Sequence, residues 1–476
     1  MPNRNVFESP LVARNASRAM GELFGARHRI LTWRRVWLAL AEGQRQAGLP
    51  ISAHQVRQLE RTLENVDFAR AARYERQTRH DVMAHLHAWG EAAPESRSIL
   101  HLGATSADIT DNADLIIMRD ALRWLAGWLA NVIDALGRFA RDQRSRATLG
   151  FTHYQPAQVT TVGKRAATWC YDFVTDLHEL ERCLATLPFR GIKGATGTQA
   201  SFLALFHGDQ RKVLALERRI ARRFGFDLIE PVTGQTYSRK IDARVLGVLG
   251  GIAASVHKFA NDLRLLANLK EIEEPFETAQ VGSSAMPYKR NPMRCERATG
   301  LARFVIALVQ SAYQTAAEQW LERTLDDSSN RRLTIPEAFL ATDGMLRLVT
   351  NVARGLVVYP RTIAVHLRTE LPFLATENIL MAAVQAGGDR QKLHERLRIH
   401  AQEAGRRVKQ EGGDNDLLDR LARDPAFAAV NLRAAVDPKR FVGRAPQQVD
   451  ELLRTYVVPI RRRYRADLGR SAELEV

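Results

Sequence analysis

The sequence predicts an all-α protein with three helical domains, and three observations support this. Apolar residues recur at alternating steps of three and four over two long segments, strand signals are sparse, and glycine- or proline-rich windows interrupt the helical pattern in only a few places. The chain has 476 residues, of which 45% are hydrophobic and 26% charged. This is the composition of a globular protein long enough for roughly three domains.

The apolar pattern predicts the order of the long helices. Residues 115–139 and 245–266 each carry a continuous apolar seam, and such seams bury against partner helices that pack nearly parallel. Residues 156–187 are also predicted to be helical. A shorter stripe covers residues 345–356, and we expect Pro336 in the first turn of that helix. Because long helices need neighbours to bury their seams, the sequence predicts a central bundle and oligomerisation through it.

Loops and changes of pattern suggest the domain boundaries. The window 281–292 combines Gly, Ser, Pro and Asn-Pro, and is therefore predicted to be a loop. After the Tyr-Pro pair at 359–360 the helices become shorter and are punctuated by Gly-Gly-Asp. We expect an N-terminal helical domain at 1–111, a central bundle domain at 112–358 and a C-terminal helical domain at 359–476.

Charge and cysteine content indicate which kinds of partner and cofactor the protein has. The net charge of +16 favours anionic partners, but the arginines are scattered rather than concentrated in one stripe. An anionic small-molecule substrate is therefore favoured, and a basic helical protein that binds nucleic acid is the alternative. Cys170, Cys183 and Cys295 are too far apart for a disulfide framework or a zinc motif, and no nucleotide-binding glycine motif is present. We expect no metal, no organic cofactor, no membrane partner and a cytoplasmic location.

The loop 282–292 is the strongest candidate for chemistry. It combines the hydroxyl of Ser283 with the cation of Lys289 and the amide of Asn291. Such a set suits a reaction that develops negative charge on oxygen, because the cation and the amide stabilise the oxyanion while the serine handles a proton. A solvated surface loop is the alternative, since turn chemistry alone produces similar windows.

Two histidines and an arginine pair are further candidates. His153 precedes a predicted helix, and His80 is followed by Asp81, which could orient its ring. Either histidine suits general acid or base catalysis, although a lone histidine is more often structural. Arg323 and Arg332 have the planar donor fork that binds phosphate or carboxylate, with a charged helix terminus as the alternative.

Several of these motifs resemble one known family. The run Gly282-Ser-Ser-Ala-Met-Pro-Tyr-Lys-Arg-Asn-Pro292 resembles the signature loop of the fumarase/aspartase superfamily, and its Ala-Met-Pro-Tyr-Lys-Arg form resembles the adenylosuccinate lyases. Further matching motifs follow in the same order along nearly the whole chain, at residues 79–85, 101–106, 150–158, 234–239, 322–328, 370–378 and 443–448.

The resemblance implies a fold and a reaction. The family has three helical domains, and its central five-helix bundles assemble into the core of a homotetramer in which each active site draws residues from three subunits. Its members eliminate fumarate from adenylosuccinate, giving AMP, and from the carboxamide intermediate SAICAR, giving AICAR, in purine nucleotide biosynthesis. The implied substrate is therefore an N-succinyl purine nucleotide, and no cofactor is needed.

The resemblance also implies residue roles. Ser283 corresponds to the base that removes the Cβ proton, His153 to the acid that protonates the leaving nitrogen, His80 to its support, and Lys289 with Asn291 to the groups that hold the carbanion's carboxylate. The expected substrate-binding residues are Arg14, Asn15, Arg79, Asp81, Thr105, Ser106, Thr152, Gln235, Asn291, Arg297, Arg323, Ser328 and Arg332.

One departure from the family pattern bears on the substrate. Asn15 stands where the family usually has a tyrosine, which removes an aromatic surface from the nucleotide pocket. The segment after Ser106 also differs from that of the animal branch. The alternative function is therefore a paralogous lyase of the same superfamily that acts on another N-succinyl compound.

Overall fold

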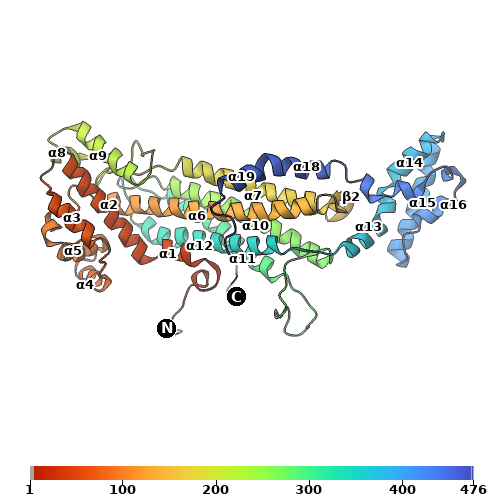
Figure 1. Ribbon diagram of the computed structural model, residues 1–476, viewed down its shortest axis with the longest axis horizontal. Coiled ribbons are helices and arrows are strands. Elements are labelled where there is room, and N and C mark those ends of the chain that lie inside the picture. Colours follow the sequence, from red (N-terminus) through yellow and green to blue (C-terminus); the bar gives the residue numbers. More distant parts are fainter. Residues whose placement is uncertain (1–4, 473, 475–476) are drawn as a thin grey trace.

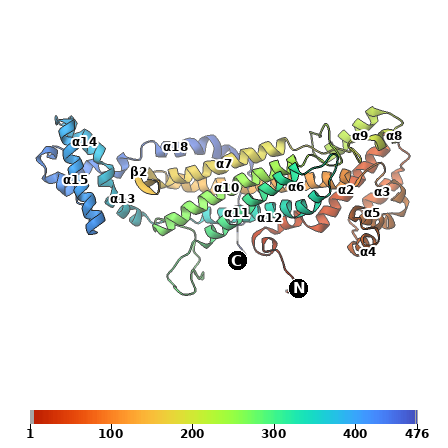
Figure 2. The same cartoon turned by 180° about the vertical axis from the view of Figure 1, so that it is seen from behind.

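The computed structural model describes residues 5–472 and Leu474, and its fold is helical, as predicted. The molecule is elongated, with long helices in the middle and shorter helices at each end (Figure 1). The bundle consists of α6 (Ser106–Asp142), α7 (Val162–Ala185), α10 (Lys240–Asn268), α11 (Met293–Ala317) and α12 (Asp326–Arg354). Seen from behind, α10, α11 and α12 lie along one face of it (Figure 2).

The two predicted apolar seams lie in the core of this bundle. Leu122 and Leu129 in the α6 seam are fully buried, as are Leu249 and Val256 in the α10 seam. The seams pack against neighbouring helices along most of their length, with α6 against α7 and α10 against α11. This confirms the prediction that the 3/4 periodicity marks long helices packed side by side.

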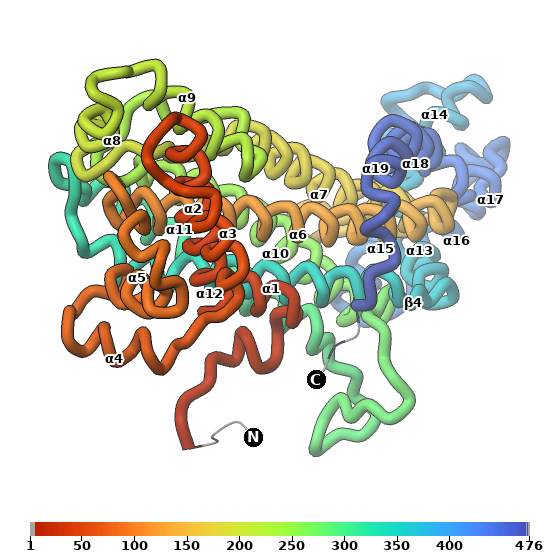
Figure 3. The backbone as a smooth tube through the Cα atoms, turned by 60° about the vertical axis from the view of Figure 1, so that its left-hand side comes forward, coloured from red at the N-terminus to blue at the C-terminus, as the bar shows by residue number. Residues whose placement is uncertain are grey.

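The N-terminal end of the molecule is a group of shorter helices around α2. The π-helical turn η1 (Leu11–Asn15) packs on α12, and α1 (Arg18–Leu23) contacts α6 and α12 as well as α2. The group itself contains α2 (Ala26–Gln46), α3 (Ala53–Thr62), α4 (Phe68–Thr78), α5 (Asp81–Ala92) and a 3-10 turn (Pro94–Ile99). Two helices from later in the chain, α8 (Ala200–Leu205) and α9 (Gln210–Arg223), lie at the same end, and α9 packs on α2 (Figure 3).

The opposite end has a small core of its own, formed by Ile379, Leu417, Phe427 and their neighbours. It is built from α13 (Pro360–Leu374), α14 (Thr376–Gln385), α15 (Arg390–Glu411), α16 (Leu417–Arg423) and α17 (Leu432–Ala435), with 3-10 turns at Pro425–Phe427 and Pro438–Arg440. The chain then returns along the bundle through α18 (Ala445–Leu452), a π-helical turn (Leu453–Val457) and α19 (Val458–Arg463). The division at residues 111 and 358 stays a prediction, and α6 runs without a break through position 111.

The segment from Pro156 begins as a strand, where a helix was expected. Strand β1 (Ala147–Thr152) pairs antiparallel with β2 (Gln155–Thr161), and α7 starts only at Val162. The β-branched run Val159-Thr-Thr161 fits a pleated strand, and the Thr161 hydroxyl accepts a hydrogen bond from the Lys164 N–H to cap the helix. A second small ladder joins β3 (Ile272–Glu273) to β4 (Val357–Val358).

The position expected for Pro336 is also wrong. Helix α12 begins at Asp326, so Pro336 lies inside it rather than in its first turn. Proline removes one backbone donor from a helix interior, but the surrounding packing can offset that loss. Here Ile335 and Ala338 are buried on either side of it, and buried Arg331 anchors the preceding turn through ion pairs.

Candidate active site

A cavity of about 370 Å³ lies at the N-terminal end of the bundle, where α2, α5, α6 and α12 meet the segment before α10. The fold brings eight of the predicted site residues to its walls: His80, Asp81, Thr105, Ser106, Gln235, Arg323, Ser328 and Arg332. They come from four separate stretches of sequence, so only the tertiary fold places them together.

Two polar contacts, both at 3.4 Å, lie at the two ring nitrogens of His80. The residue is the N-cap of α5, and its Nδ1 accepts a hydrogen bond from the Met83 N–H at 3.4 Å, while its Nε2 lies 3.4 Å from the Ser106 hydroxyl. Asp81 Oδ2 pairs with Arg332 at 2.7 Å, and Asp81 Oδ1 lies 3.8 Å from His80 Nδ1. Burial raises the pKa of Asp81, but the hydrogen bond and charge of Arg332 outweigh it and hold this pKa below its ordinary value. The carboxylate therefore stays ionised beside the histidine.

The N-terminus of α6 gives the cavity a positive end. Thr105 is the N-cap, and its N–H donates to the Asp108 carboxylate at 2.8 Å as part of a capping box. Thr105, Ser106 and Ala107 line the cavity, so the N-terminus of α6, which is the positive pole of its helix dipole, lies at the cavity wall. Such a helix terminus favours a carboxylate or phosphate group.

A buried network of ion pairs lies under the cavity. Arg239 contacts Asp327 on α12 at 2.7 Å and Asp111 on α6 at 3.2 Å. Burial raises the pKa of Asp111, but the charges of Arg239 and Arg331 outweigh it and lower this pKa. Asp327 also accepts Arg323 at 3.1 Å, so the network fixes a predicted substrate residue to two bundle helices.

Three arginines of the cavity were not among the predicted site residues: Arg29, Arg239 and Arg331. Arg331 pairs with Asp242 at 2.6 Å and with Asp114 at 3.1 Å, so its charge is neutralised within the fold. Arg29 lies beside Trp33, with its guanidinium carbon 5.8 Å from the ring centre. Arg239 ends the matching motif 234–239, whereas no sequence signal separates Arg29 and Arg331 from the many other arginines in the chain.

His153 occupies the tip of the β1–β2 hairpin. The two residues between the strands, His153 and Tyr154, have φ of 53° and 56°. Positive φ at both positions is what a two-residue type I′ turn requires, and it is uncommon outside glycine and asparagine. His153 and its neighbour Thr152 are both exposed. Neither residue lies in the cavity.

The predicted loop 281–292 lies between β3 and α11 and extends away from the bundle (Figure 1). Ser283 Oγ accepts the Met286 N–H at 3.1 Å, and the Asn291 amide donates to the Gly282 carbonyl at 2.8 Å. A Cβ on Gly282 would lie 2.2 Å from the Lys289 carbonyl oxygen, so this close approach requires glycine. Lys289 itself is exposed.

Arg14 and Arg297 form a further group near the start of α11. Burial lowers the pKa of Arg297, and the positive charges of Arg14 and Arg294 lower it further, which places these cations close together. Asn15 uses its side chain locally, since its amide donates to the Pro10 carbonyl at 2.8 Å. Arg79 is exposed at the C-terminus of α4, where its φ of 56° ends the helix.

Within one chain, the predicted site residues therefore lie far apart. The cavity lies at the N-terminus of α6, whereas the His153 hairpin follows the C-terminus of the same helix. A helix of 37 residues is about 55 Å long, so His80 and His153 lie at opposite ends of the bundle. The loop carrying Ser283 likewise follows the far end of the 29-residue α10, about 43 Å from its start beside Gln235.

Residues 5–472 contain neither a candidate membrane-spanning helix nor a candidate metal-binding cluster. No helix there is long and apolar enough to cross a bilayer. No group of three or more His, Cys, Asp or Glu in that range is arranged to hold a metal ion. Cys170, Cys183 and Cys295 are buried and free of disulfides.

Comparison with known proteins decides the family. A family described as a lyase matches residues 26–307, and one described as the adenylosuccinate lyase C-terminus matches residues 372–452. Over 458 residues the chain is 51% identical to the adenylosuccinate lyase of Schizosaccharomyces pombe and 50% identical to that of Saccharomyces cerevisiae, with 95% of both chains covered in each case. The chain belongs to the adenylosuccinate lyase family.

Membership of the adenylosuccinate lyase family makes this chain a lyase, and solved structures agree on the fold. The crystal structure of 3-carboxy-cis,cis-muconate lactonizing enzyme from Pseudomonas putida superimposes with a TM-score of 0.81 at 23% identity, covering 96% of this chain and 100% of that one. At that identity the likeness concerns the fold alone. It confirms the predicted all-α architecture with its long central helices.

Proposed function

We propose that the protein eliminates fumarate from adenylosuccinate, giving AMP, and from SAICAR, giving AICAR. The cavity at the N-terminus of α6 carries this proposal, because it gathers His80, Ser106 and Gln235 with cationic Arg323 in a chain that is half identical to enzymes named adenylosuccinate lyase. The substrate has two carboxylates and a phosphate. A helix N-terminus surrounded by arginines suits such an anion.

The complete site is proposed to form between subunits of a homotetramer. The long separation between the cavity and both His153 and Ser283 supports this, since one chain cannot place these groups around one small substrate. Exposed apolar side chains along α10, α11 and α12 supply surface for such an assembly: Leu265, Ile306, Tyr313 and Leu333. The exposure of several large apolar side chains on neighbouring bundle helices supports an interaction surface there.

The proposed chemistry is a proton abstraction followed by loss of the amine. Ser283 removes the Cβ proton, and the electron pair left on carbon delocalises into the adjacent carboxylate, where Lys289 and Asn291 oppose the added charge. The pair then forms the carbon–carbon double bond of fumarate as the carbon–nitrogen bond breaks. His153 donates a proton to the departing nitrogen, and His80 supports it.

Replacing Lys289 with methionine is expected to lower kcat about a hundredfold and to change KM only a few-fold. The cation mainly opposes charge that develops after proton abstraction, so it contributes more to the transition state than to substrate binding. Steady-state kinetics on adenylosuccinate would measure both constants. Arg290→Met is the matched control, because Arg290 is the neighbouring cation in the same loop. A raised KM with unchanged kcat in Lys289→Met would refute the proposed role of Lys289.

The reaction itself is tested with purified protein and adenylosuccinate, by following the ultraviolet change and fumarate release. Turnover would establish the substrate and make Asn15 a tolerated variation. A folded tetramer without turnover would contradict the proposal and favour the alternative of a paralogue, to be identified with other N-succinyl compounds. The cytoplasmic location and the absence of nucleic-acid binding stay part of the proposal, and salt-dependent DNA binding without lyase activity would contradict it.

A further inference from the structure

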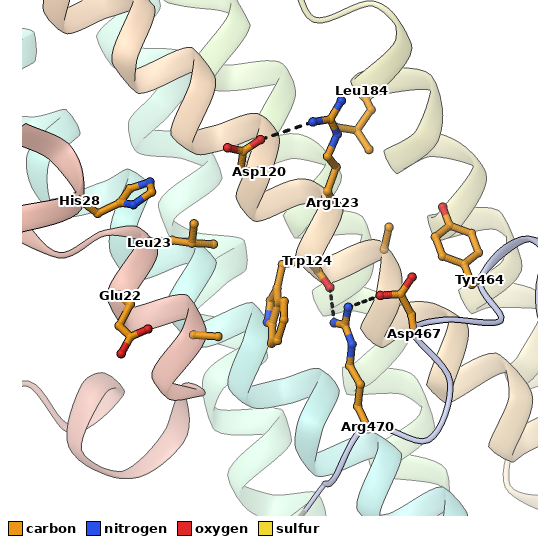
Figure 4. A pocket seen from close by; sticks show the side chains of 12 residues that line it. Glu22, Leu23, His28, Asp120, Arg123, Trp124, Leu184, Tyr464, Asp467 and Arg470 are labelled. Atoms are coloured by element: carbon orange, nitrogen blue, oxygen red, sulfur yellow. Dashed lines mark hydrogen bonds and ion pairs between the residues drawn. The ribbon is translucent and has the colours of Figure 1, made fainter. Parts of the chain in front are cut away.

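A second cavity, of about 650 Å³, lies between α1, α6 and the C-terminal segment 464–470, outside the site described above. Figure 4 shows Trp124 of α6 at its centre, with Arg470 of the C-terminal segment beside it. The guanidinium carbon of Arg470 lies 4.1 Å from the centre of the Trp124 ring, and its Nη1 donates to the Trp124 carbonyl at 2.9 Å. The C-terminal segment thus covers one side of this tryptophan.

The C-terminal segment is tied to the bundle by several hydrogen bonds around Asn131. The Asn131 amide donates to the Asp467 carbonyl at 2.8 Å, and its oxygen accepts the Gly469 N–H at 2.9 Å. Arg354 on α12 donates to the Arg470 carbonyl and to the Asn131 oxygen, both at 2.8 Å. These bonds hold the segment across α6 and α12.

Trp124 connects this segment to a buried carboxylate. Its indole N–H donates to Asp343 Oδ1 at 2.7 Å, and Asp343 is fully buried on α12. The other oxygen of Asp343 accepts the backbone N–H of Ser17 at 2.5 Å. One carboxylate therefore joins α6 and α12 to the N-terminal segment, because Ser17 follows the turn η1 and caps α1 with its hydroxyl.

Two further residues of α12 hold the same segment. Arg347, one turn beyond Asp343, donates to the Asn15 carbonyl at 3.0 Å. Gly344 lies so close that a Cβ added there would be 3.1 Å from both the Cβ and the carbonyl oxygen of Asn15. Residues of α12 therefore contact the backbone at Asn15 and at Ser17, on either side of buried Ala16. These contacts lie directly after Arg14 in the chain.

We infer that Asp343 is a positioning residue for substrate binding, acting through the Ser17 backbone to fix the segment that carries Arg14. Trp124, covered by the C-terminal segment, orients the Asp343 carboxylate by donating to its second oxygen. Neither residue lies among those that line the proposed substrate cavity. The inference rests on the expected role of Arg14 in substrate binding.

A double-mutant cycle tests whether Asp343 acts through Arg14. The variants are Arg14→Ala, Asp343→Asn and the two combined, with kcat and KM for adenylosuccinate and the melting temperature measured for each. Asparagine has the size of aspartate, but its NH₂ group would face either the Trp124 indole N–H or the Ser17 backbone N–H. Because both of these groups donate hydrogen bonds, one of the two bonds is lost. We expect Asp343→Asn to raise KM about fivefold with kcat within about a factor of two, and the double variant to match Arg14→Ala alone.

The outcomes separate the two claims. If Arg14→Ala leaves KM unchanged, the proposed role of Arg14 fails. If Arg14→Ala raises KM but Asp343→Asn does not, Arg14 keeps its role and the positioning inference is overturned. The same holds if both single variants raise KM and the KM increase of the double variant is the product of the two single increases. A lower melting temperature with unchanged KM in Asp343→Asn also overturns it, because that result describes a purely structural carboxylate.

Gly344→Ala keeps the inference testable if Asp343→Asn does not fold. Alanine has a higher helix propensity than glycine, so α12 itself loses no intrinsic stability. The added methyl group displaces Asn15, and we expect KM to rise several-fold with an unchanged melting temperature. Trp124→Phe should also raise KM, because it removes the hydrogen bond to Asp343. Trp128→Phe is the control and should leave KM unchanged, since the buried Trp128 indole N–H has no hydrogen-bond partner within residues 5–472. Unchanged KM in Gly344→Ala would contradict the inference.

Discussion

Replacing Ser283 with alanine is expected to lower kcat about a thousandfold while the helical fold and the oligomeric state stay unchanged. The proposed chemistry needs a base at Cβ, and the variant has no group that accepts the proton. In the described loop, the Ser283 hydroxyl contacts only the Met286 N–H at 3.1 Å, so its loss removes little local structure. Steady-state kinetics with adenylosuccinate, beside circular dichroism and size-exclusion chromatography, would measure the effect.

Ser284→Ala is the matched control for this variant. Ser284 is an exposed hydroxyl in the same loop, next to Ser283, and has no proposed role. We expect its kcat to stay within about threefold of the wild-type value. Near-normal turnover in Ser283→Ala, or an equal loss in both variants, would show that Ser283 is not the base.

Replacing His153 with asparagine is expected to lower kcat by about a hundredfold to a thousandfold. The leaving nitrogen needs a proton as the carbon–nitrogen bond breaks, and asparagine cannot supply one. Asparagine is chosen because it tolerates the positive φ that the hairpin tip requires, so the turn is kept and the imidazole alone is lost. Stopped-flow or steady-state assays of fumarate release would measure the rate.

Tyr154→Asn provides the comparison for the hairpin. Tyr154 is the second residue of the same turn and also has positive φ, but it has no assigned part in the reaction. We expect a change of at most a few-fold in kcat. A loss in Tyr154→Asn as large as that in His153→Asn would indicate that the hairpin shape matters and that the imidazole does not act as the acid.

The sequence predicts the bundle well because apolar periodicity is a local property. The seams at 115–139 and 245–266 place one face of each helix in the core, and a local pattern suffices for that. Prediction from this pattern fails where other local preferences compete with it. Residues 156–161 became a strand because their β-branched side chains pair with β1, and Pro336 sits within a helix whose packing offsets the lost donor.

The candidate site residues could be predicted from motifs, but their spatial relations could not. Nothing in the sequence reveals that His80 and His153 are separated by the length of α6, because motif order carries no distances. Nor could the network of Arg239 and Arg331 be recognised, since burial and ion pairing distinguish these arginines from others. The local hydrogen bond of Asn15 to Pro10 likewise depends on the shape of a π-helical turn.

The most direct test of a shared active site is complementation between inactive variants. His80→Asn, which keeps an N-cap residue at α5, and His153→Asn would be coexpressed with different tags, and tetramers carrying both tags would be assayed. If one site draws His80 and His153 from different subunits, about a quarter of the sites in a random mixture are intact, and lyase activity returns to about that fraction. Doubly tagged tetramers no more active than either parent variant would contradict a site shared between subunits.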